Sequence, residues 1–172
     1  MMIRTWLALA ALAFAYAASA QQPTGQIQGQ AGDFTAIAVA TTDADWLEKW
    51  QTPRQTTPNF NVTSELSAGQ TATILTFFSN PQVRDGTVRI ACDIRIIKPD
   101  GEVANTTPAT PCVPGRFTGP PWDVYLTGMA ITIKNESKDD PGMWRFQIGV
   151  SDQFRDVRIP LELAIEWRGD AQ

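Results

Sequence analysis

The chain has 172 residues, with 14 basic residues, 18 acidic residues and no histidine. This length suits one domain. The acidic balance, with Lys and Arg scattered along the chain, argues against binding to nucleic acid or to anionic lipid, since both require basic surfaces. Without histidine, Ser-His-Asp and Cys-His catalysis and His-ligated zinc sites are excluded. No catalytic residue, metal site or cofactor is predicted.

Residues 1–20 (MMIRTWLALAALAFAYAASA) have the features of a bacterial signal peptide. Arg4 precedes an apolar core rich in Ala and Leu, which ends at the small-x-small sequence Ala18-Ser19-Ala20. A membrane anchor is the alternative, but the apolar core is shorter than the roughly 20 residues that span a bilayer. We therefore expect cleavage after Ala20, a periplasmic or secreted location, and no membrane span in the mature chain.

The mature chain is predicted to comprise a disordered lead-in, one β domain and a short tail. Residues 21–31 (QQPTGQIQGQA) are rich in Gln and Gly, which favours disorder. Residues 32–168 form the predicted domain and residues 169–172 the tail. The domain contains about seven segments in which apolar and polar residues alternate, as they do in half-buried strands. The predicted strands are 33–41, 59–66, 70–79, 86–98, 125–134, 143–151 and 157–167.

A short helical turn is predicted near residues 43–50, between the first two strands. Thr42 can cap it, and Trp46 and Trp50 fall four residues apart on one face. Pro53 follows its end. We expect the two Trp rings to cover the open end of a sandwich of strands.

Seven strands with little helix predict an all-β fold, with two antiparallel sheets packed as a single immunoglobulin-like β-sandwich. Cys92 and Cys112 are an even pair of cysteines in an exported chain, which predicts a disulfide. The alternative is a buried free thiol, because Cys92 falls on the apolar side of its strand. Trp144 and Trp167 fit the buried phases of the last two strands.

Carboxylates are the remaining groups that could support chemistry. Asp139 and Asp140 precede one predicted strand, and Asp152 and Asp156 follow it. About ten intervening residues in a strand separate the two pairs by roughly 30 Å, so they cannot share one calcium ion. We interpret all four as solvated turn residues.

Asp93 lies within the clearest strand, beside Arg89 and Arg95. This arrangement predicts that Asp93 is one end of a cross-strand ion pair at the surface.

The Pro-rich segment 105–122 (NTTPATPCVPGRFTGPPW) is predicted to be a long loop, because its five prolines exclude an interior strand. It carries Arg116, Phe117 and Trp122, which are the candidate binding residues of the chain. Aromatic side chains on a stiff loop suit recognition of a protein or a glycan. The alternative is that the loop folds back as a lid over the core.

Four further segments together carry a resemblance to known proteins. They are W-L-x-x-W-x-x-P at 46–53, L-T-F-F at 75–78, C-D-I-x-I-x-x-P-D-G at 92–101 and D-P-G-M-W-x-F-x-I-x-V-x-D at 140–152. The ensemble resembles a group of uncharacterised bacterial exported (periplasmic) proteins with an immunoglobulin-like β-sandwich. The resemblance extends over nearly all of the mature chain and implies a compartment and a fold, but no activity.

The D-x-G-x-W sequence at 140–144 also resembles the D-x-G-x-Y entry to a late strand of immunoglobulin-like domains. Trp144 stands at the position of the corner tyrosine. Phe146 stands where an antibody-type domain has its second cysteine.

We therefore expect a non-catalytic periplasmic binding or protein-interaction module, whose partner is another envelope protein or a glycan. The alternative is a carboxylate-dependent hydrolase acting on a glycan or cell-wall substrate. A glycoside hydrolase of that kind requires two carboxyl groups roughly 5–10 Å apart.

Overall fold

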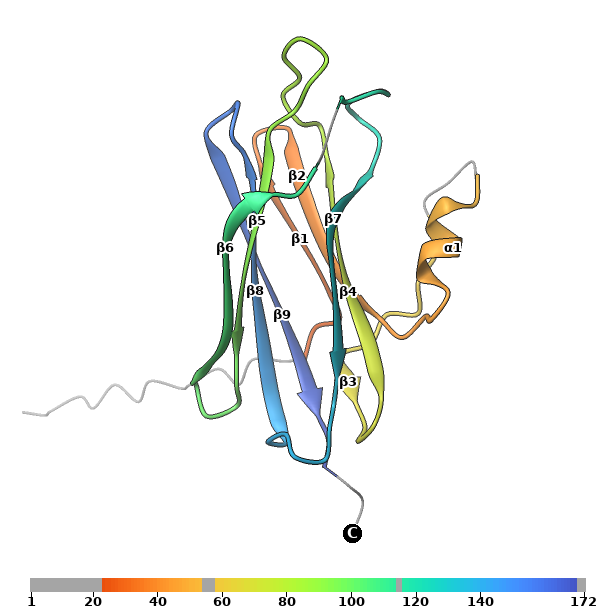
Figure 1. The fold of residues 1–172 in the computed structure, drawn as a ribbon, viewed down its shortest axis with the longest axis vertical. Coiled ribbons are helices and arrows are strands. Elements are labelled where there is room, and N and C mark those ends of the chain that lie inside the picture. Colours follow the sequence, from red (N-terminus) through yellow and green to blue (C-terminus); the bar gives the residue numbers. More distant parts are fainter. Residues whose placement is uncertain (1–22, 54–57, 114–115, 170–172) are drawn as a thin grey trace, which may run out of the picture.

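The computed structural model describes residues 23–53, 58–113 and 116–169. The predicted signal peptide at residues 1–20 and the tail after residue 169 lie outside the described residues. Within these ranges the chain forms nine strands and one short helix (Figure 1). In chain order they are β1 (Gln26–Ala31), β2 (Phe34–Thr41), α1 (Trp46–Gln51), β3 (Glu65–Leu66), β4 (Thr71–Ser79), β5 (Ile90–Ile97), β6 (Val103–Pro111), β7 (Tyr125–Lys134), β8 (Gly142–Asp152) and β9 (Val157–Trp167).

The strands form two sheets, with the orders β1-β2-β4-β7 and β3-β9-β8-β5-β6. Neighbouring strands are antiparallel except for the two-residue pair of β3 and β9, which is parallel. The two sheets face each other, and their buried apolar side chains meet in one core (Figure 1). The predicted all-β class is confirmed.

The core follows from period-two alternation in the long strands. In β8, Trp144, Phe146, Ile148 and Val150 are buried, while the residues between them are mostly less buried. The rings of Trp144 and Trp167 stack with centroids 4.2 Å apart, as their predicted buried phases require. The indole Nε1 of Trp144 donates a hydrogen bond to the Asp140 carbonyl, at 3.0 Å, and so fastens the entry of β8.

A second apolar cluster lies on the other face of the β1-β2-β4-β7 sheet. Its buried members are Val39, Leu75 and Phe77, which have the opposite phase to the core residues of β2 and β4. Trp46 and Trp50 of α1 pack on this cluster, and the Trp50 ring is 5.0 Å from that of Phe77. The prediction that the two Trp rings cover the open end is therefore wrong, because they cover the outer face of a sheet.

The predicted disordered lead-in is wrong for residues 26–31, which form the edge strand β1. β1 pairs with β2 along its whole length, from Gln26 opposite Val39 to Ala31 opposite Phe34. Gly29 lies against β9, because a Cβ at this position would collide with the Ile159 side chain. Although β1 is polar and contains a glycine, it can therefore lie at the sheet edge and cover core residues of β9.

The segment 105–122 is not one loop, since residues 103–111 form β6. β6 is the edge strand beside β5, and all nine of its residues are exposed. Proline is tolerated at such an edge, which reconciles the strand with its sequence. The predicted disulfide joins Cys92 of β5 to Cys112, the first residue after β6.

Candidate functional site

The chain crosses from one sheet to the other immediately after the disulfide. The Cys112 amide donates to the Ile90 carbonyl of β5, and its own carbonyl accepts a hydrogen bond from the Gly128 amide of β7, at 2.6 Å. This crossing brings the candidate binding residues to the start of β7. We call residues 117–125 the Trp122 turn.

The aromatic base of the Trp122 turn is part of the core. Phe117 packs with its ring centroid 4.6 Å from that of Tyr125, which in turn stacks on Phe78 of β4. The Phe117 amide donates to the Gly86 carbonyl. Arg116 is exposed, and its backbone forms an isolated antiparallel β-bridge with Thr87. Phe117 therefore covers the core, as the lid alternative predicted for the whole segment.

Hydrogen bonds hold the top of the turn in one shape. The Tyr125 hydroxyl donates to the Pro120 carbonyl, at 2.7 Å, and the Asp123 amide donates to the same oxygen. Burial, with a smaller contribution from the Asp123 carboxylate, raises the pKa of Tyr125, which keeps its hydroxyl protonated as a donor. The Asn80 amide at the end of β4 donates to the Pro121 carbonyl.

Gly119 is required where the turn passes over Tyr125. Its φ of +126° lies in a region that residues with a Cβ rarely adopt. A Cβ at this position would also stand 2.6 Å from the Tyr125 hydroxyl oxygen. Two prolines, Pro120 and Pro121, follow and fix φ in the next two residues.

The Trp122 side chain is 72% exposed on this fixed turn. The structure thus separates the two aromatic candidates, because Phe117 packs on the core and Trp122 does not. The exposed large apolar residues elsewhere in the described ranges lie on separate segments; they are Leu47, Val62, Val83 and Val103.

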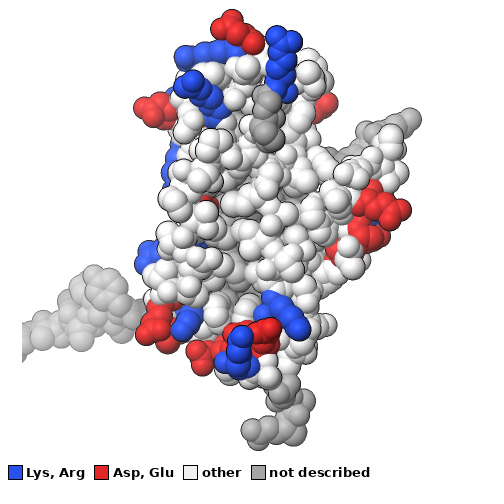
Figure 2. Space-filling model, viewed as in Figure 1, with Lys and Arg blue, Asp and Glu red and all other residues white. Residues whose placement is uncertain are grey.

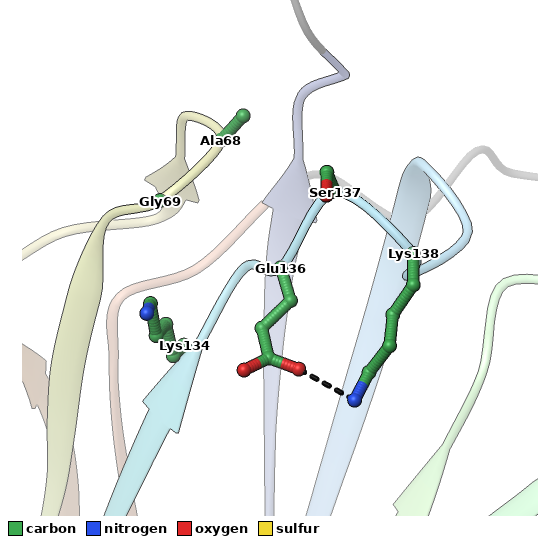
Figure 3. Close-up of a pocket in the computed structure, with 6 residues that line it drawn as sticks. All are labelled: Ala68, Gly69, Lys134, Glu136, Ser137 and Lys138. Carbon is green, nitrogen blue, oxygen red and sulfur yellow. Dashed lines mark ion pairs between the residues drawn. The ribbon is translucent and has the colours of Figure 1, made fainter.

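The rest of the described surface carries several hollows, three of which adjoin charged or apolar clusters. One, of about 460 Å³, is polar and lies where β4 begins and β7 ends (Figure 3). Figure 3 shows the exposed ion pair of Glu136 and Lys138 at its rim, with Lys134 between that loop and Gly69. Lys138 lowers the pKa of Glu136, as expected of a solvated pair. The described residues that line this hollow do not point to a particular ligand.

The second hollow, of about 530 Å³, adjoins Arg89, Asp152 and Arg158. The interpretation of Asp152 as a solvated turn acid is wrong, because it is completely buried. Its carboxylate accepts hydrogen bonds from the amides of Gln82, Phe154 and Arg155. Asp152 therefore organises two loops.

The predicted cross-strand ion pair of Asp93 is confirmed, and its partner is neither Arg89 nor Arg95. It is Arg158 of β9, which approaches Asp93 to 2.7 Å across the intervening strand β8. Gly149 of β8 lies beneath the pair, and a Cβ there would collide with both side chains.

The third hollow, of about 210 Å³, is apolar and lies on the outer face of the β1-β2-β4-β7 sheet. Ile37, Val39, Phe60, Phe77 and Val124 line it. Asn61, which follows Phe60 in the chain, bonds Asp43, whose side chain is 4% exposed and pairs with Lys49 at 2.9 Å. Among the described residues, no group of three or more His, Cys, Asp and Glu side chains could hold a metal ion. No described helix is long and apolar enough to cross a membrane.

No family model matches the chain, and no curated protein matches it either. Among solved structures, the chain is similar to a family 123 glycoside hydrolase from Clostridium perfringens, with 12% sequence identity and a TM-score of 0.39. The similarity covers 80% of this chain and 28% of the hydrolase chain, so this chain spans less than a third of that protein. A likeness of this degree carries no argument about fold or function.

Proposed function

We propose that the protein is a non-catalytic binding module of the bacterial envelope, exported to the periplasm or secreted, which engages its partner through the Trp122 turn. The predicted signal peptide at residues 1–20 supports export. The absence of histidine from the whole chain supports a role without catalysis.

One observation carries the proposal: an indole that is 72% exposed stands on a turn fixed at Pro120 and Pro121. A rigid aromatic group gives up little conformational freedom on binding, and Trp is enriched among residues that dominate binding energy. The core gains nothing from this side chain, so its fixed presentation is best explained by recognition.

The buried carboxylates favour binding over the hydrolase alternative. Asp152 accepts three backbone hydrogen bonds, and Asp43 is held by Lys49 and Asn61. Burial raises the pKa of Asp43, but these hydrogen bonds and the Lys49 ammonium outweigh it and give a pKa of about 2. A general acid needs a raised pKa, so the lowered pKa of Asp43 does not suit that role.

We further propose that the two packed sheets form a single immunoglobulin-like β-sandwich, of the kind found in the exported proteins that the sequence resembles. The hydrogen bond from Trp144 to the carbonyl four residues upstream supports this, since a corner tyrosine makes a similar bond in immunoglobulin-like domains.

The decisive experiment compares Trp122→Ala with Phe117→Ala in thermal unfolding and in retention of envelope material on immobilised protein. Trp122→Ala should leave the melting temperature within a degree or two and reduce retention. Phe117→Ala, the matched aromatic variant, should lower the free energy of unfolding by about 1–3 kcal/mol, because it removes a partly buried ring. Unchanged retention by a stable Trp122→Ala variant would contradict the proposed site.

A further inference from the structure

We propose that the group recognised by Trp122 is the ring face of a neutral carbohydrate. This inference rests on the proposed function, since it names the ligand of the same turn. The C–H bonds on one face of a sugar ring form a weakly positive, apolar surface. The face of an indole carries the negative part of the aromatic quadrupole, so the two surfaces attract each other when stacked.

The Trp122 turn offers one large exposed apolar ring, which favours a sugar over a protein surface. Specific protein interfaces bury at least about 1,000 Å² in total, and their dominant residues sit within a ring of other contacts. The other described large apolar residues that are exposed all lie outside residues 117–125; they are Leu47, Val62, Val83 and Val103. A single ring is too small a nucleus for such an interface, but it is the size of one sugar residue.

Polar groups that suit sugar hydroxyls are attached to the same turn. The Asn80 amide nitrogen bonds the Pro121 carbonyl at 2.6 Å, which places the half-exposed Asn80 and Ser79 next to the turn. The φ of Asn80 is +53°, a conformation that asparagine tolerates better than most residues. Amide and hydroxyl side chains can each donate to and accept from the hydroxyl groups of a sugar.

The charges near the turn indicate that the sugar is neutral. Asp123, the residue after Trp122, and Arg116, directly before the turn, are both exposed, so the two charges nearest to the indole along the chain offset each other. The whole chain also carries a formal net charge of −4. Figure 2 shows basic and acidic side chains together at the end of the molecule where β7 begins, and a broad uncharged area along the strands. The net negative charge of the chain therefore gives no long-range attraction for an acidic polysaccharide.

The test is calorimetric titration of the exported chain with three hexasaccharides: β-1,4-linked glucose, β-1,4-linked N-acetylglucosamine and the acidic α-1,4-linked galacturonate. We expect at least one neutral hexamer to bind, and the acidic one to bind more weakly. Trp122→Ala should weaken the neutral interaction about tenfold or more, and Trp122→Tyr by only a few-fold. Val103→Ala, an exposed apolar truncation on β6, is the control and should leave binding unchanged.

Equal affinity of the native chain and Trp122→Ala for the neutral hexamer would overturn the inference, as would stronger binding of the acidic one. Absence of neutral binding would overturn it too. If Trp122→Ala nevertheless reduces retention of envelope protein, the binding role of the turn stands and its ligand is a protein. If retention is also unchanged, the proposed function fails together with the inference.

Discussion

Asp43 connects the two segments on either side of α1. Its carboxylate accepts hydrogen bonds from the backbone amide and the side-chain amide of Asn61, at 2.9 and 2.6 Å, and pairs with Lys49 of the helix. α1 has no buried residue of its own, so it relies on such contacts and on its Trp rings. This one carboxylate therefore helps to keep the helix on the sheet.

The low pKa of Asp43 predicts a specific acid sensitivity. Its folded value of about 2 lies below the ordinary value of 3.8, so its contribution to stability is present above about pH 4 and is lost as the pH falls towards 2. Asp43→Asn should cost about 1–3 kcal/mol at pH 7, because buried donors lose a charged acceptor. The cost should fall steadily between pH 4 and pH 2, as measured by urea unfolding.

Asp45→Asn is the matched control, since Asp45 also pairs with Lys49 but its side chain is 56% exposed. Exposed ion pairs contribute little, so this variant should unfold almost as the native chain does at every pH. A cost of Asp43→Asn that stays constant down to pH 2 would show that the charge of Asp43 plays no part.

The contacts of the charged residues could not be predicted from the sequence, because they join distant segments. Asp152 looks like an ordinary turn acid, but its shortest hydrogen bond, at 2.7 Å, comes from the amide of Gln82, which lies 70 residues away. Asp93 has Arg89 and Arg95 close to it in the sequence, yet pairs with Arg158, 65 residues distant. The shape of the Trp122 turn depends on Asn80, the residue after β4, which is also distant in the sequence. The aromatic residue itself, however, was a candidate from its Pro-rich surroundings.

At the scale of single elements, local alternation located the long strands that have one face on the core, but the predicted strand 59–66 is wrong except for residues 65–66, which form β3. The bounds of β7 (Tyr125–Lys134) and β9 (Val157–Trp167) agree with the predicted ranges at both ends. β1 and β6 were missed, because neither has a local apolar pattern. Each is an edge strand whose existence depends on the exposed hydrogen-bonding edge of its neighbour, β2 or β5.

β6 presents an uncharged edge of nine exposed residues, and such edges invite pairing with other chains. Pro108 and Pro111 lack the N–H group that a further strand would need, and register shifts interrupt the β5–β6 ladder. We expect the double variant Pro108→Thr and Pro111→Thr to self-associate more strongly than the native chain. Sedimentation velocity over a range of concentrations measures this directly.

The control for that variant is Ala104→Thr with Ala109→Thr, which adds the same two side chains to β6 without adding N–H donors. It should sediment as the native chain does. If both double variants associate equally, side-chain composition rather than backbone pairing governs the edge.

At the scale of the molecule, the Cys92–Cys112 disulfide lies where the two sheets are joined. Cys92 is buried in β5, and the Cys112 carbonyl accepts a hydrogen bond from the Gly128 amide of β7. The disulfide therefore constrains both the edge of the five-stranded sheet and the base of the Trp122 turn. Removing the disulfide should therefore destabilise the structure beyond β6 as well.

The double variant Cys92→Ala and Cys112→Ala tests this coupling. The two cysteines are 20 residues apart, and closing a loop of that length stabilises the fold by about 3 kcal/mol through the entropy of the unfolded chain. For a domain of this size we expect the melting temperature to fall by about 10 °C.

Intact-mass analysis supplies the reference: the exported native chain should begin at Gln21 and lack two hydrogens. A native mass with free thiols or a retained leader would contradict the proposed export, whereas an unchanged melting temperature would show that hydrogen bonds alone hold the crossing.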